Sequence, residues 1–93
     1  MPWTTLITAD ELAAAIDRCL VIDCRHDLTD REAGRRGFAE AHVPGARFVH
    51  MDEQLSGPKD GRNGRHPMPP REAVRALLES LGLDDDRQLV VYD

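Results

Sequence analysis

The sequence lacks any apolar run of the about 20 residues that a membrane-spanning helix needs. Charged residues make up 31% of its 93 residues. The first eight residues also lack the apolar centre of a signal peptide. We therefore expect a cytoplasmic protein with no membrane partner.

The sequence also has fewer basic than acidic residues. Lysine and arginine total 12 against 17 acidic residues, which gives a net charge of −5, and a nucleic-acid-binding surface needs the opposite balance. Arginines do cluster locally. They are Arg31, Arg35 and Arg36 in one group and Arg62 and Arg65 in another. Either these are solvated loop charges, or they form a patch that attracts a small anionic substrate.

Only two cysteines are present, Cys19 and Cys24. Their odd separation along a predicted strand points their side chains to opposite faces, which argues against a disulfide and against a shared metal site. We expect both to pack in the core. No pair among the four histidines has the spacing of a zinc motif, and no cofactor is predicted. The histidines are His26, His42, His50 and His66.

The first half of the sequence predicts a capped helix followed by a buried strand. Thr8 and Glu11 form a capping box, which predicts a helix over 9–17. Residues 19–22 are uniformly apolar, which is typical of a strand buried on both faces of a parallel sheet. A charged, glycine-containing loop over 23–37 then leads to a helical turn at 38–42.

The second half repeats this alternation. We predict a strand at 46–49 and a long loop over 51–70. Apolar residues at helical spacing predict a helix after Pro70, ended by Gly82. These residues are Val74, Leu77, Leu78 and Leu81. A last apolar strand over 88–92 has the character of a central strand, yet no helix follows to cover it. The pattern predicts an α/β domain with a parallel sheet that is incomplete in this chain.

Four segments, in order, resemble the rhodanese family of sulfurtransferases. They are 20–25 (LVIDCR), 38–46 (FAEAHVPGA), 66–70 (HPMPP) and 90–93 (VVYD). The resemblance implies a rhodanese-like parallel sheet flanked by helices. The most specific element is the His-Val-Pro-Gly-Ala sequence, whose role in the family is structural, with His42 hydrogen-bonded locally. Asp23 and Arg25 are expected to form a local ion pair or to anchor the backbone.

Asp93 occupies the position at which catalytic rhodanese domains carry a cysteine nucleophile. A carboxylate cannot carry a transferable sulfur atom, so the segment alone is expected to be inactive. In tandem members of the family the N-terminal domain commonly has aspartate there, and the second domain supplies the cysteine. The resemblance thus implies that 1–93 is the N-terminal part of a rhodanese-like domain. Its partners would be the rest of the same protein and a small anionic sulfur donor, thiosulfate or 3-mercaptopyruvate.

Two further residues match positions that face the active site in mercaptopyruvate-type sulfurtransferases. Asp52 and His66 correspond to an aspartate and a histidine that take part in an acid/base relay there. The alternative is structural, with Asp52 capping a turn and His66 bonded to backbone beside Pro67.

Two other functions remain open. The chain could be a non-enzymatic rhodanese-like scaffold or partner-binding module. It could also be a phosphatase of related fold, although such enzymes need a cysteine where Asp93 stands. A second rhodanese-like domain with a cysteine-headed loop downstream would separate the sulfurtransferase from the scaffold.

Overall fold

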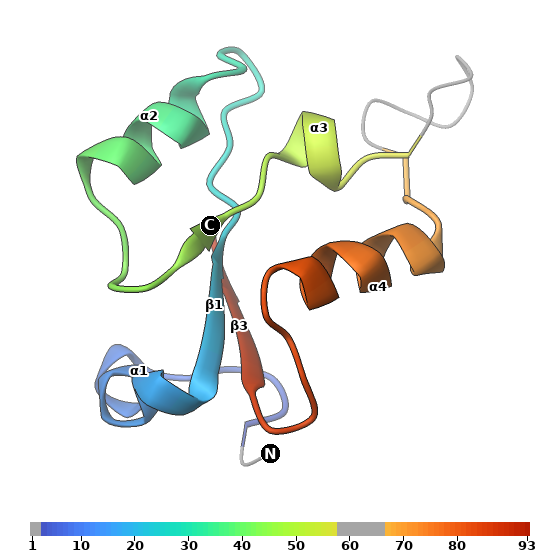
Figure 1. Cartoon of the computed structure of the whole chain (residues 1–93). Coiled ribbons are helices and arrows are strands. Elements are labelled where there is room, and N and C mark those ends of the chain that lie inside the picture. Colours follow the sequence, from blue (N-terminus) through green and yellow to red (C-terminus); the bar gives the residue numbers. More distant parts are fainter. Residues whose placement is uncertain (1–2, 58–66) are drawn as a thin grey trace.

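Three parallel strands form the sheet at the centre of the computed structural model, which describes residues 3–57 and 67–93. Strand β1 (Cys19–Asp23) lies in the middle, flanked by β2 (Arg47–Phe48) and β3 (Gln88–Tyr92) (Figure 1). All five residues of β1 are buried. The predicted parallel α/β sheet with a buried first strand is confirmed, although the second strand is shorter than the predicted 46–49.

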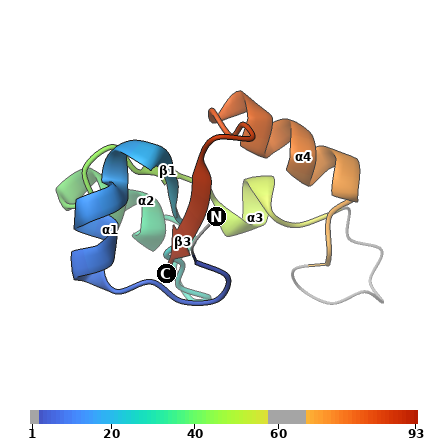
Figure 2. The ribbon, with the colours of Figure 1, turned by 90° about the horizontal axis from the view of Figure 1, so that it is seen from below.

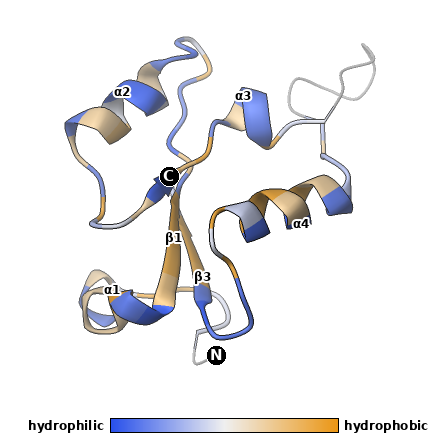
Figure 3. Cartoon of the chain, in the orientation of Figure 1, coloured by the Kyte–Doolittle hydropathy of each residue, from blue (hydrophilic) through white to orange (hydrophobic). Residues whose placement is uncertain are grey.

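Helices cover both faces of this sheet (Figure 2). Helix α1 (Ala9–Ala15) and helix α2 (Ala33–Glu40) contribute to the core on one face, and α4 (Arg71–Ser80) contributes to the core on the other. Because alternate residues of β1 point to opposite faces, Leu20 and Ile22 belong to the α4 side while Val21 belongs to the α1 side. The strand is apolar on both faces for this reason (Figure 3).

The capping box at the start of α1 forms as predicted. The Thr8 hydroxyl accepts from the Glu11 N–H at 3.1 Å, and the Glu11 carboxylate accepts from the Thr8 N–H at 2.9 Å. The helix is shorter than the predicted 9–17, because its last residues tighten into a 3₁₀ turn, η1 (Ile16–Arg18), that leads directly into β1.

Two helices extend into segments that we expected to be loops. Helix α2 begins at Ala33, inside the predicted loop 23–37, and includes only residues 38–40 of the predicted helical turn 38–42; α3 (Met51–Gln54) lies inside the predicted loop 51–70. Gly34 made the first segment look irregular, but a Cβ atom there would overlap the Arg25 carbonyl oxygen. Tertiary packing therefore requires glycine at this point of the helix, which overrides its poor helix propensity.

The turn between α2 and β2 has the conformation that its sequence predicts. The His42 Nδ1–H donates to the Phe38 carbonyl at 2.7 Å, which confirms the local hydrogen bond. The Ala46 N–H donates to the Val43 carbonyl at 2.9 Å, and Gly45 has φ +77°, a conformation that favours glycine.

Strand β3 has one unpaired edge in the described part of the chain. It hydrogen-bonds to β1 alone, so within 3–57 and 67–93 β1 is the middle strand and β3 lies at the edge. That β3 is central in a complete domain stays a prediction. Residues 3–7 run beside that edge and leave a cavity of about 310 Å³ between the two segments.

No helix in 3–57 or 67–93 is both long enough and apolar enough to cross a membrane.

Candidate functional site

Because the three strands are parallel, their carboxyl ends meet at one edge of the sheet, where ligand sites of such folds gather. Asp23 ends β1, Asp93 follows β3, and His50, two residues after β2, is the N-cap of α3. The carboxyl end of the chain accordingly lies beside the ends of the other strands (Figure 1).

At the carboxyl ends of the strands, one buried carboxylate is the centre of a hydrogen-bond network. Asp23 is fully buried, and the Arg25 guanidinium contacts both of its oxygens at 2.7–3.1 Å. The Tyr92 hydroxyl donates to Asp23 at 3.0 Å and accepts from the Val43 N–H at 3.2 Å. Arg25 also donates to the Ala41 carbonyl at 2.7 Å. The predicted ion pair is therefore confirmed, and it ties together β1, β3 and the chain leading to β2.

These contacts lower the pKa of Asp23 and raise the pKa of Tyr92. Burial alone would raise the pKa of Asp23, but hydrogen bonds from Arg25 and Tyr92 outweigh it, so this pKa lies below its ordinary value of 3.8. Burial raises the pKa of Tyr92, and its bond to the Asp23 carboxylate adds to the shift. Both groups therefore keep the protonation states in which Tyr92 donates and Asp23 accepts.

The two cysteines lie on opposite faces of the sheet, as predicted. Cys19 belongs to the core on the α1 side and Cys24 to the core on the α4 side, and both are free and buried. Burial raises the pKa of the Cys24 thiol, and the negative charges of Asp23 and Asp93 raise it further. Because the thiolate is the nucleophile, these surroundings make Cys24 a poor one.

Asp52, one of the two predicted relay residues, lies in the first turn of α3. Its side chain is 16% exposed, and its carboxylate is 3.9 Å from the Arg31 guanidinium. His50 is the N-cap of this helix, and the role of Asp52, in a relay or as the cap of a turn, stays a prediction. The other relay residue, His66, lies outside the described residues, as do Arg62 and Arg65 of the second arginine cluster.

The first arginine cluster is engaged with acidic side chains. Arg31 and Arg35 contact Glu53 at 3.4 and 3.0 Å, and Arg36 pairs with Asp30. The two pairs with Glu53 link the chain before α2 and the helix itself to α3, and the Arg36–Asp30 pair links α2 to the chain before it. They satisfy much of the positive charge that would otherwise attract an anion.

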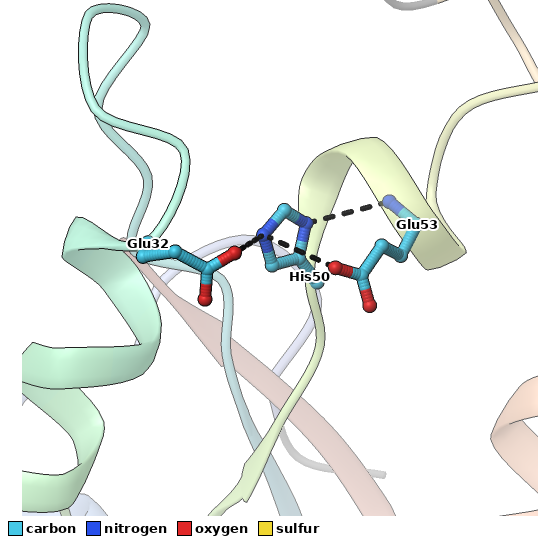
Figure 4. Close-up of side chains that lie close together, drawn as sticks. All are labelled: Glu32, His50 and Glu53. Carbon is cyan, nitrogen blue, oxygen red and sulfur yellow. Dashed lines mark hydrogen bonds and ion pairs between the residues drawn. The ribbon is translucent and has the colours of Figure 1, made fainter.

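His50 forms a group with two glutamates that resembles a metal site by distance alone (Figure 4). Its Nε2 atom lies 4.0 Å from Glu32 and 3.7 Å from Glu53. However, Nδ1 faces the backbone N–H of Asp52 at 3.1 Å, so it must accept and the ring proton is on Nε2. Since Nε2 donates that proton to the Arg31 carbonyl at 2.9 Å, it has no lone pair for a metal. We therefore assign no metal to this group.

Sequence reasoning considered His50 only as a zinc ligand and missed its capping role. A local signal was present, because His50 directly precedes Met51-Asp52-Glu53, and acidic residues favour the first turn of a helix. Its second partner, the Arg31 carbonyl, is 19 residues away and could not be found from spacing.

Comparison with known proteins agrees with this fold. The family model of the rhodanese-like domain matches residues 8–93. A probable 3-mercaptopyruvate sulfurtransferase of Pseudomonas aeruginosa is 42% identical, covering 100% of this chain and 34% of that protein. A thiosulfate sulfurtransferase of Azotobacter vinelandii is 39% identical, covering 71% of this chain and 23% of that protein.

A solved structure gives the same result. The 3-mercaptopyruvate sulfurtransferase from Leishmania major superposes with a TM-score of 0.84 at 25% identity, covering 94% of this chain and 24% of that chain. The chain thus spans about a third or less of the length of these proteins. With its parallel sheet, its ion pair between Arg25 and the buried Asp23, and the family match over 8–93, the chain belongs to the rhodanese-like family.

Proposed function

We propose that this chain is the N-terminal part of the non-catalytic rhodanese-like domain of a longer sulfurtransferase. That protein moves sulfane sulfur from thiosulfate or 3-mercaptopyruvate to a thiophilic acceptor through a cysteine persulfide outside this chain. The observation that carries the proposal is the exit of β3. Its last residue, Tyr92, is held by Asp23, and a carboxylate, Asp93, follows where a nucleophile would stand. Because Cys19 and Cys24 are both buried, this chain offers no accessible thiol at the carboxyl ends of the strands.

The open edge of β3 supports the need for further polypeptide of the same protein. The cavity beside it is lined by residues 3–7 on one side and by 88–91 on the other. The Oε1 atom of Gln88 is buried without a hydrogen-bond partner in the described part of the chain. An added strand would supply backbone N–H groups to this edge and cover it, since an exposed edge leaves polar groups unpaired.

The assay that tests the sulfurtransferase proposal compares the longer protein with residues 1–93 alone. With thiosulfate and cyanide, the longer protein should form thiocyanate, and replacing the cysteine of its second-domain loop by serine should abolish this. Residues 1–93 should give only background. Thiocyanate formation by 1–93 that Cys24→Ser removes would show that the thiol is a nucleophile. No persulfide with either donor in the longer protein would favour the scaffold function.

We further propose that Asp52 and His66 form the acid/base relay for mercaptopyruvate. When a cysteine thiolate takes the substrate sulfur, the C–S bond breaks, an S–S bond forms and pyruvate enolate leaves, which needs a proton. A histidine oriented by a carboxylate can deliver it. Asp52 supports this role because it lies at the carboxyl edge of the sheet with Arg31 beside it.

In the longer protein, His66→Ala should lower turnover with mercaptopyruvate by roughly 10²-fold, as is typical for losing an acid/base group. Turnover with thiosulfate should fall less, because sulfite leaves without needing that proton. The measurement is kcat with each donor, and Glu79→Gln, in an exposed pair of α4, supplies the control. If kcat falls equally little with both donors, Asp52 and His66 have only a structural role.

A further inference from the structure

The imidazole ring of His50 is buried and hydrogen-bonded through both of its nitrogen atoms. The residue is 1% exposed. Nδ1 accepts from the backbone N–H groups of Asp52 at 3.1 Å and Glu53 at 3.4 Å, while Nε2 donates to the Arg31 carbonyl at 2.9 Å. Only the neutral ring with its proton on Nε2 can make all three bonds at once.

The backbone of His50 is held as firmly as its ring. Its N–H donates to the Gln54 side chain at 2.7 Å, and its carbonyl accepts from the Gln54 N–H at 2.8 Å. The rings of Phe48 and His26 meet the imidazole edge-on at centroid distances of 6.1 Å. A four-residue helix such as α3 has little stability of its own, so its orientation depends on these contacts.

The ring of His50 links the backbones of Asp52 and Arg31, and the side chains of these two residues form an ion pair. Nδ1 binds the N–H of Asp52, and Nε2 binds the carbonyl of Arg31, whose guanidinium is 3.9 Å from the Asp52 carboxylate. We propose that His50 is the positioning residue of Asp52, which it fixes against Arg31 through its Nε2–H tautomer. This inference rests on the proposed role of Asp52 in the relay.

The charges that face the ring do not replace these bonds. Glu32, just before α2, and Glu53, in α3, approach Nε2 at 4.0 and 3.7 Å, but both are half-exposed and bound by Arg35. A proton added to Nδ1 would point at two backbone donors and would remove the cap of α3. The carboxylates would attract the charged ring, yet they could not restore the lost acceptor.

Two substitutions separate the bonds at Nδ1 from the bond at Nε2. His50→Asn places an accepting oxygen where Nδ1 stands and so keeps the helix cap, which asparagine favours. His50→Gln places its amide near Nε2 and so keeps the bond to Arg31 but loses the cap. His50→Ala removes both, and Glu79→Gln, in an exposed pair of α4, serves as the control.

Hydrogen exchange of the longer protein tests the cap. The Asp52 and Glu53 amides should exchange roughly fivefold faster or more in His50→Gln and His50→Ala, as expected for losing a typical N-cap. They should remain protected in His50→Asn and in the control. Unchanged exchange in both the glutamine and alanine variants would overturn the proposal.

The tautomer provides a second readout that does not depend on activity or on a variant that folds poorly. In ¹⁵N-histidine-labelled protein, the signal lost in His50→Asn should show an unprotonated Nδ1 and a protonated Nε2. A protonated Nδ1 would overturn the proposal. In kinetics, His50→Gln should lower kcat for mercaptopyruvate more than His50→Asn does. If tautomer and exchange are as expected while Asp52→Asn leaves turnover unchanged, the positioning by His50 stands and the relay is wrong.

Discussion

At the scale of single residues, the contribution of an ion pair to stability depends on whether its members are buried or exposed to water. Asp23 is fully buried and accepts from Arg25, from Tyr92 and from the Arg25 backbone N–H at 2.9 Å. Arg75 and Glu79 are as close, at 2.8 Å, but are 80% and 58% exposed. Water competes for the exposed pair, whereas nothing replaces the partners of a buried carboxylate.

Asp23→Asn should therefore lower the Tm of the longer protein by roughly 5 °C or more, because an amide donor then faces the Arg25 donors. Glu79→Gln should shift the Tm by no more than about 1 °C. Thermal unfolding followed by circular dichroism gives both values. Equal shifts would mean that burial of Asp23 does not make its contacts more important.

The same variant has an expected pH dependence. A carboxylate whose pKa is lowered in the folded state stabilises the fold above its unfolded-state pKa, and this stabilisation is lost as pH falls through the folded-state pKa. The stability difference between wild type and Asp23→Asn should thus be largest near neutral pH and shrink below about 3.8. Urea unfolding at several pH values measures it, and a difference that grows in acid would contradict the assignment.

At the scale of elements, helix α2 shows how a neighbouring segment selects residues inside a helix. Two glycines of this helix face the chain around Arg25, but at different distances. A Cβ atom on Gly34 would overlap the Arg25 carbonyl, whereas one on Gly37 would lie 3.6 Å from the nearest atom, in the Arg25 side chain. Only the first glycine is required by close packing.

Gly34→Ala should destabilise the longer protein by ~3 kcal/mol, the upper range for overpacking, because backbone must move to admit the methyl group. Gly37→Ala should be neutral or stabilising by up to ~1 kcal/mol, since alanine is the better helix former. Urea denaturation compares the two variants. Similar losses in both would show that helix packing at Gly34 is looser than the structure indicates.

At the scale of the whole molecule, two apolar surfaces remain uncovered in the described part of the chain. One is the open edge of β3 with its adjoining cavity. The other is a groove of about 980 Å³ along the outer side of α4, whose apolar lining includes Met68, Val74, Leu78 and Leu83. Met68 is 90% exposed. This groove is the larger of the two, yet its lining contains none of the residues assigned to the candidate site.

We expect residues 1–93 alone to fold poorly, because a small domain that leaves such surfaces open buries too little area. The isolated chain should show no cooperative thermal transition and poorly dispersed amide NMR signals. The longer protein should show both a sharp transition and dispersed signals. A cooperative transition of the monomeric 93-residue chain would contradict this expectation and the added strand beside β3.

Local sequence patterns determined the elements whose information lies within a few residues. The capping box of Thr8 and Glu11, the apolar run of β1 and the apolar spacing along α4 each predict an element that the structure contains. The Asp23–Arg25 pair was also predictable, because its members are two residues apart. The relay of Asp52 with His66 and the incomplete domain stay predictions.

Tertiary structure alone decided what depends on distant contacts. Helix α2 carries glycine at position 34 because the Arg25 carbonyl leaves no room for a Cβ atom, and α3 is capped by His50, whose ring reaches Arg31. Asp23 receives its third partner from Tyr92, 69 residues further along the chain. No periodicity or motif encodes such pairs, since they form only when the parallel strands bring their carboxyl ends together.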